Sequence, residues 1–173
     1  MNKKTRAAVL QYCLYVLLLF LAYILQTTPG FLQFGEYKPM LIMPVMVSIA
    51  MQEREFVGGL MGALAGALCD LTSNTYFGFN AAMLLVFGAV TGLLCEYLTQ
   101  RNLRNCLLLT GLFLVLVSGA NYFFQFGIWH YPDAGPRWIL EILWTGLPTL
   151  VLAVPVFFLF RWLSARFAVM RQL

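Results

Sequence analysis

Residues 58–70 read Gly58-Gly59-Leu60-Met61-Gly62-Ala63-Leu64-Ala65-Gly66-Ala67-Leu68-Cys69-Asp70. Gly58, Gly62 and Gly66 are spaced four residues apart, so on a helix they form one smooth stripe where another backbone can approach closely. Two interpretations fit this stripe: packing inside a helical bundle, or a face for the helix of a partner protein. The stretch ends on a carboxylate, which costs at least about 2.5 kcal/mol when it lies uncompensated at the centre of a bilayer. We therefore predict a closely packed helix whose aspartate needs polar partners.

The composition places this helix in a membrane. Of the 173 residues, 61% are hydrophobic and only 10% are charged, and the mean hydropathy is +0.81. Soluble domains average about 45–50% apolar residues. Six membrane-spanning helices of about 20 residues would use roughly 120 residues, which leaves no room for a soluble catalytic domain. We expect a single all-α integral membrane domain over residues 1–173.

The apolar runs predict six transmembrane helices in one bundle. Their approximate bounds are 7–25, 39–51, 56–71, 76–98, 106–127 and 138–163. The first run is too long for the core of a signal peptide and no A-x-A cleavage pattern follows it, so we expect a retained anchor. The second and third runs are short, and one re-entrant hairpin is the alternative. Their uniformly apolar composition favours two spans.

The basic residues predict the orientation. With six crossings, both termini lie on one side together with the loops at 52–55 and 100–105. That side carries nine of the eleven basic residues: Lys3, Lys4, Arg6, Arg54, Arg101, Arg104, Arg161, Arg166 and Arg171. Only Lys38 and Arg137 lie opposite, so the positive-inside rule places both termini in the cytoplasm. The net charge of +4 is explained by basic helix ends that meet anionic lipid, and we expect no nucleic-acid partner.

Polar residues recur in the predicted outer half of the bundle. Asp70 lies about 21 Å along its helix at 1.5 Å per residue, and Asn80 returns to a similar depth on the next helix. The full predicted layer contains Asp70, Asn80, Ser118, Asn121, Gln125, Glu141 and Thr145. Two interpretations fit: hydrogen bonds that hold the helices together, or a hydrated pocket for a polar ligand or a partner's side chain. We expect the Asn80 amide to donate to the Asp70 carboxylate, so that the two act as one unit.

Motifs of catalysis and metal binding are missing from the sequence. It contains no G-x-S-x-G, no H-E-x-x-H and no P-loop. Asp70 is the only aspartate inside a predicted span, whereas an intramembrane aspartyl protease needs two. The cysteines Cys13, Cys69, Cys95 and Cys106 lack metal-ligand spacing and are interpreted as packing residues. We expect no enzymatic reaction, no metal and no cofactor.

Three motifs together indicate a family. Lys38-Pro39 precedes the second run, residues 58–70 follow the pattern G-x-x-x-G-x-x-x-G-x-x-x-D, and Gly78-Phe79-Asn80-Ala81-Ala82 comes next. With these motifs, residues 38–98 resemble the MreD family of rod-shape-determining membrane proteins. The resemblance implies a non-enzymatic component of the bacterial cell-wall elongation complex in the cytoplasmic membrane. Its implied partners are MreC, the actin-like MreB, RodA and a penicillin-binding transpeptidase.

Two other classes of function remain open. The fold of the MreD family is similar to that of the S-components of energy-coupling-factor vitamin transporters. Such a component would use the polar layer as an outward-facing pocket for a small molecule and a small-residue face to dock on its energising subunit. A purely structural scaffold facing the lipid would explain the composition but not the polar layer.

Overall fold

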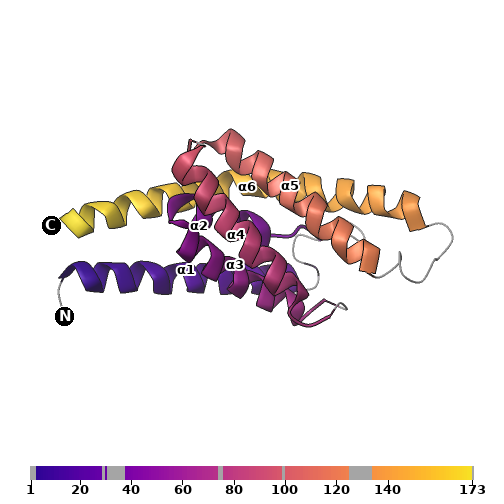
Figure 1. The fold of residues 1–173 in the computed structure, drawn as a ribbon, viewed down its shortest axis with the longest axis horizontal. Coiled ribbons are helices and arrows are strands. Elements are labelled where there is room, and N and C mark those ends of the chain that lie inside the picture. Colours follow the sequence, from indigo (N-terminus) through magenta and orange to yellow (C-terminus); the bar gives the residue numbers. More distant parts are fainter. Residues whose placement is uncertain are drawn as a thin grey trace.

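The chain is a bundle of α-helices. The computed structural model describes residues 3–28, 30, 38–73, 76–98, 100–124 and 134–172, which form six helices and no strand. The helices are α1 (Lys3–Thr27), α2 (Ile42–Gln52), α3 (Glu55–Asp70), α4 (Phe79–Tyr97), α5 (Leu103–Tyr122) and α6 (Ala134–Gln172). Both termini lie at one end of the bundle, α1 and α6 run along its length, and the α3–α4 hairpin crosses it obliquely (Figure 1). The all-α prediction is confirmed.

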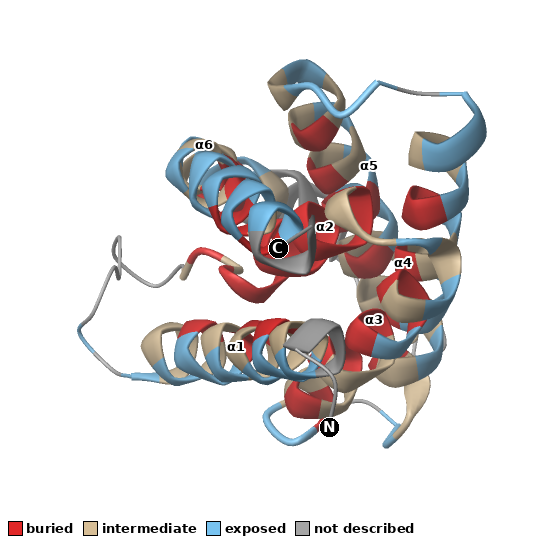
Figure 2. Cartoon of the chain, turned by 90° about the vertical axis from the view of Figure 1, so that its left-hand side faces the viewer, coloured by how far each residue is buried: buried red, intermediate tan, exposed pale blue. Residues whose placement is uncertain are grey.

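The shortest helix, α2, forms the core. Its residues from Ile42 to Met51 are all buried, and α2 packs against each of the other five helices. Figure 2 shows α2 at the centre, seen from the end that carries the termini. A helix that is apolar on every side is stable only when it is enclosed in this way. Pro44 fits because it lies in the first turn, where the backbone N–H has no helical acceptor.

Four helical segments are long and apolar enough to cross a membrane. Within the described residues they are Arg6–Thr27, Phe79–Tyr97, Leu103–Tyr122 and Ile142–Val169. Large apolar side chains such as Leu17, Leu112 and Val151 are more than half exposed along them, as expected for surfaces that face lipid. α3 and α2, with 16 and 11 residues, are shorter than this length.

The largest boundary difference concerns α6. It extends to Gln172, nine residues beyond the predicted end, because hydropathy marks only the lipid-facing part of a helix. Its last turns still contact the bundle, since Leu163 and Phe167 are buried. The guanidinium of Arg166 lies 5.3 Å from the ring centre of Trp162.

The other helices also differ at their ends. α1 begins at Lys3, four residues before the predicted start, and α5 begins at Leu103, three residues before it. α4 starts at Phe79 and not at residue 76, because Gly78 has a φ of +92° that a right-handed helix cannot include. α2 starts at Ile42, three residues after the predicted start. Residues 125–127 of the predicted fifth helix lie outside the described residues.

Candidate functional site

The glycine stripe of α3 packs against the backbone of α4. Gly58, Gly62 and Gly66 are buried there. A Cβ atom added at Gly58 would lie 2.6 Å from the carbonyl oxygen of Gly88, and one added at Gly66 would lie 2.5 Å from the Cα of Ala81. Real Cβ atoms essentially never come closer than 3.0 Å to another heavy atom. The stripe therefore packs inside the bundle, and α4 leaves no room there for the helix of a partner protein.

α4 contributes two matching glycines that the sequence analysis missed. Gly88 and Gly92 are four residues apart, the same spacing as on α3, and both are buried. A Cβ atom on Gly92 would lie 2.6 Å from the Cα of Glu55 at the start of α3. The signal was present in the sequence as a second small-x-x-x-small pattern. We call the five residues Gly58, Gly62, Gly66, Gly88 and Gly92 the glycine seam.

At the far end of the seam, the carboxylate of Asp70 caps α4. Asp70 is the last residue of α3 and is 5% exposed. Its Oδ2 accepts hydrogen bonds from the N–H groups of Gly78 at 2.9 Å and Ala81 at 3.1 Å, and its Oδ1 accepts one from the N–H of Asn80 at 3.1 Å. The first N–H groups of a helix lack acceptors within the helix, and its N-terminus favours negative charge. Asp70 supplies both the acceptors and the charge from the neighbouring helix.

The turn before α4 explains why the cap comes from outside the helix. Gly78 holds the N-cap position and has no side chain to offer. The next N–H, that of Phe79, donates to the carbonyl of Tyr76 at 3.1 Å, and the N–H of Ala82 donates to the carbonyl of Gly78 at 3.0 Å. Together with the three bonds to Asp70, the backbone donors of this first turn are satisfied.

The side chain of Asn80 joins a third helix to this cap. Asn80 is 1% exposed, and its Nδ2 donates to Oδ1 of Asp70 at 2.9 Å and to Oγ of Ser73 at 3.2 Å. Its Oδ1 accepts a hydrogen bond from Nδ2 of Asn121 on α5 at 3.3 Å. We call Asp70, Asn80 and Asn121 the Asp70 cluster. It connects α3, α4 and α5 at the end of the bundle opposite the termini.

The remaining residues of the predicted polar layer are placed differently. Ser118 is half-buried on α5, and Thr145 is buried on α6. The carbonyl of Thr145 accepts from the hydroxyl of Thr149, whose oxygen accepts the N–H of Met40 at 3.0 Å. These bonds tie α6 to the segment that leads into α2. Two predicted members lie outside what the structure describes: Gln125 and the side chain of Glu141.

A second buried polar group lies nearer the termini and was not predicted. The Nε2 of Gln11 on α1 donates to the hydroxyl of Tyr15 and to Oε1 of Glu53, both at 2.7 Å. Gln11 is 2% exposed and Tyr15 is fully buried. Glu53 lies in the turn between α2 and α3, so these bonds fix α1 to that turn. The available signal was a glutamine and a tyrosine at i and i+4 in an otherwise apolar helix.

The geometry of the Asp70 cluster indicates its chemical role. Both carboxylate oxygens already accept N–H donors from the same chain, and the side chain is buried. A carboxylate held in this way has no free oxygen to present to a ligand or a reacting proton. The cluster is therefore a joint between helices, and it holds the α3–α4 hairpin that the glycine seam brings together.

The comparisons with known proteins agree with these motifs. A family model for the rod shape-determining protein MreD matches residues 6–163, which include the whole glycine seam and the Asp70 cluster. Searches of curated proteins and of solved structures found no match. The match confirms the resemblance seen in residues 38–98. The chain belongs to the MreD family of rod shape-determining membrane proteins.

Proposed function

We propose that this protein is a non-enzymatic component of the bacterial cell-wall elongation complex in the cytoplasmic membrane. In this role it binds MreC and helps to organise the RodA and penicillin-binding synthases beside MreB. The match to the MreD family over residues 6–163 carries the proposal. The Asp70 cluster supports it, because a rigid joint of three helices suits a protein that holds partners in place. Since the glycine seam is filled by α4, the surface that binds MreC lies elsewhere on the bundle.

The proposed function is tested by complementation and capture. In a rod-shaped bacterium that lacks its own MreD, the chain is expected to restore rod shape. Purification of the tagged chain from those membranes is expected to yield MreC and the wall synthases. A chain that neither restores shape nor captures MreC would contradict the proposal. The variant Gly111→Ala serves as a control that should behave like the wild type, because among the described residues its Cβ would meet Leu150 alone, at 3.8 Å.

The transporter alternative has a separate outcome in the same experiment. Capture of an ATPase pair with its energising subunit would indicate an S-component. The structure gives this alternative no specific support. The two described cavities are lined mostly by apolar side chains, and the Asp70 carboxylate is occupied within the protein.

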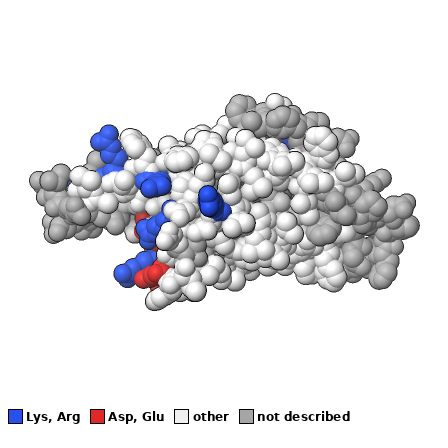
Figure 3. All heavy atoms as spheres, turned by 90° about the horizontal axis from the view of Figure 1, so that it is seen from above, with Lys and Arg blue, Asp and Glu red and all other residues white. Residues whose placement is uncertain are grey.

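We also propose six membrane crossings with both termini in the cytoplasm. Both termini lie at one end of the bundle (Figure 1), and on the face shown in Figure 3 the described basic side chains gather toward that end. The turn between α2 and α3, which carries the exposed Arg54, belongs to the same end because Glu53 bonds to Gln11 near the start of α1. The positive-inside rule then supports a cytoplasmic location for this end.

Cysteine labelling tests this topology. In a cysteine-free background, Thr72→Cys in the α3–α4 turn is expected to react with an impermeant maleimide on intact cells. Asn102→Cys and Arg54→Cys are expected to react only after permeabilisation, because six spans place both in the cytoplasm. External labelling of Asn102→Cys would overturn the orientation. An Arg54→Cys that stays unreactive even after permeabilisation would indicate a re-entrant hairpin.

A further inference from the structure

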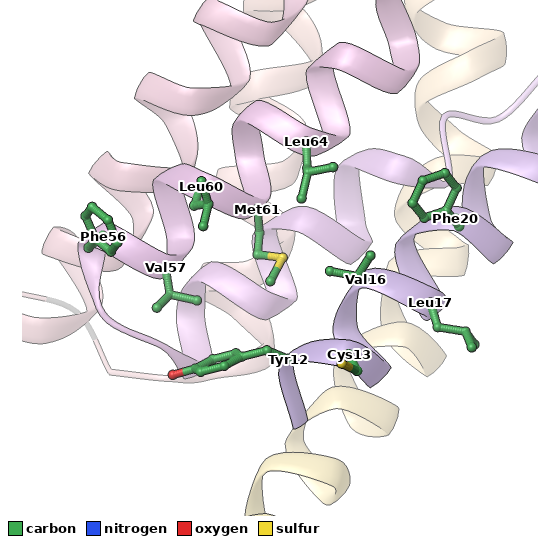
Figure 4. A pocket seen from close by; sticks show the side chains of 10 residues that line it. All are labelled: Tyr12, Cys13, Val16, Leu17, Phe20, Phe56, Val57, Leu60, Met61 and Leu64. Atoms are coloured by element: carbon green, nitrogen blue, oxygen red, sulfur yellow. The ribbon is translucent and has the colours of Figure 1, made fainter. Parts of the chain in front are cut away.

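An apolar groove separates α1 from α3. Its volume is about 770 Å³, and ten side chains from the two helices line it. In Figure 4, Val57, Met61 and Leu64 of α3 lie across the groove from Val16 and Phe20 of α1. The groove opens on a surface where Leu17 and Leu60 are more than half exposed. In a membrane this surface meets acyl chains.

The length of the groove fits one leaflet. Its lining runs from Tyr12 to Phe20 on α1 and from Phe56 to Leu64 on α3, starting on each helix near the end that carries the termini. Eight residue steps on a helix rise about 12 Å. Half of a hydrocarbon core is about 15 Å thick, whereas a spanning helix needs about 30 Å. A single acyl chain therefore matches the groove better than a whole transmembrane helix.

The lining also favours an acyl chain over a helix. Interfaces between transmembrane helices are enriched in glycine, alanine, serine and threonine, which let two backbones approach. None of these residue types lines the groove, and the glycines of α3 are already covered by α4. The walls are instead large and flexible or aromatic, including Tyr12, Phe56 and Met61. Such walls enclose a flexible chain well.

A second apolar groove adjoins the first along α3. It has a volume of about 370 Å³ and runs between α3 and α4 past Gly59, Leu85 and Ala89. The two small residues in its lining already pack on each other in the α3–α4 contact, because a Cβ atom on Gly59 would lie 3.3 Å from the Cβ of Ala89. Phe56 and Leu60 line both grooves and form the ridge between them. The two grooves have room for the two acyl chains of one lipid molecule, one on each side of this ridge. The headgroup of that lipid would then lie at the start of α3.

The start of α3 carries charges of both signs. The side chain of Arg54 is 82% exposed, and its Nε lies 3.9 Å from Oε1 of Glu96. Glu55 lines the second groove, where its side chain is half-buried. A phosphate is complementary to the arginine, and an ammonium group with N–H donors is complementary to the carboxylate. A headgroup that carries both groups fits this mixed charge better than a purely anionic one.

We propose that α3 lies between the two acyl chains of a specifically bound phospholipid. The site binds one molecule of the phosphatidylethanolamine type. One acyl chain lies in the α1–α3 groove and the other in the α3–α4 groove. Arg54 binds the phosphate, and Glu55 accepts a hydrogen bond from the ammonium group. The proposal goes beyond the role in wall synthesis and does not depend on it, because binding is measured on the purified chain.

Native mass spectrometry of the full chain in detergent tests the site. The probes are phosphatidylethanolamine, phosphatidylcholine and phosphatidylglycerol with identical acyl chains. One ethanolamine lipid per protein is expected, with a preference of about tenfold over the other two, the size of one charge-assisted hydrogen bond. The choline lipid lacks N–H donors on its ammonium group and the glycerol lipid lacks the ammonium group, so these two probes isolate the role of Glu55.

Variants separate the headgroup from the chains. Glu55→Gln is expected to remove most of the preference for the ethanolamine lipid. Arg54→Gln is expected to weaken the binding of all three lipids about tenfold. Leu64→Trp is expected to weaken their binding to the same extent, because the larger side chain fills the groove. Phe56→Ala removes part of the ridge between the grooves and is expected to reduce lipid retention. The core is not disturbed, because the side chain is 77% exposed. The matched controls are Arg101→Gln and Leu112→Trp, which lie outside both grooves and should bind like the wild type.

Two results would overturn the lipid site. Equal retention of the three lipids, unchanged in Arg54→Gln and Glu55→Gln, would mean that the grooves hold only non-specific boundary lipid. Loss of MreC capture in Phe56→Ala and Leu64→Trp, with lipid retention unchanged, would assign the grooves to a partner's helix. Failure of MreC capture in the wild type, with ethanolamine binding intact, would count against the proposed function alone.

Discussion

Asp70→Ala is expected to lower the free energy of unfolding by about 3 kcal/mol or more. The substitution removes the acceptor of four hydrogen bonds and leaves three backbone N–H groups and the Asn80 amide without it. Each buried donor left unsatisfied costs about 1–3 kcal/mol. The first turn of α4 also loses a favourable negative charge. Unfolding of the purified chain in mixed micelles with increasing SDS measures the loss.

Two further variants show whether the cluster acts as a unit. Asp70→Asn keeps one acceptor oxygen, but its amide nitrogen would face N–H donors, so we expect an intermediate loss. Asn80→Ala is expected to cost clearly less in the Asp70→Ala background than in the wild type, since residues in one network are not additive. Strictly additive losses, or an unchanged stability in Asp70→Ala, would show that the carboxylate does not hold the turn.

The sequence predicted part of this cluster. The cost of a carboxylate in a membrane required a partner for Asp70, and Asn80 at a similar depth was the natural donor. The three backbone donors were not foreseen, because they depend on the positive φ of Gly78, which starts α4 three residues later than the apolar run. Asn121 was predicted to lie in the same layer, but its hydrogen bond to Asn80 was not predicted. The depth of a side chain could be predicted, but not which neighbours it bonds.

The short apolar runs show a different limit. Hydropathy identified residues 39–51 as a helix but could not distinguish a lipid-facing span from a helix enclosed on every side. That distinction depends on which helices surround α2, and all five others do. The glycine stripe on α3 likewise had two interpretations from the sequence. The structure decides between them, because Gly88 and Gly92 of α4 pack against the stripe. Spacing along one helix predicts a packing face, whereas the identity of the partner depends on both helices.

Gly62→Ala is expected to be strongly destabilising, although alanine is the better helix former. Its Cβ would lie 2.8 Å from the carbonyl carbon of Leu84, against backbone that cannot rotate away as a side chain can. Overpacking of this kind costs about 1–3 kcal/mol or more. Helix propensity returns at most about 1 kcal/mol. The same unfolding measurement in mixed micelles should show a net loss of stability, and Gly62→Leu should prevent the α3–α4 pair from forming.

Gly111→Ala is the matched control for the seam. It is the same substitution in another helix, where Leu150 Cδ2, at 3.8 Å, is the one described atom within 4 Å of the new Cβ. Helix propensity should then dominate, so stability is expected to stay unchanged or to rise by up to about 1 kcal/mol. If Gly62→Ala and Gly111→Ala behaved alike, α3 and α4 would not be in backbone contact. Because the seam positions Asp70 over the first turn of α4, loss of the seam is expected to reduce the cost of Asp70→Ala as well.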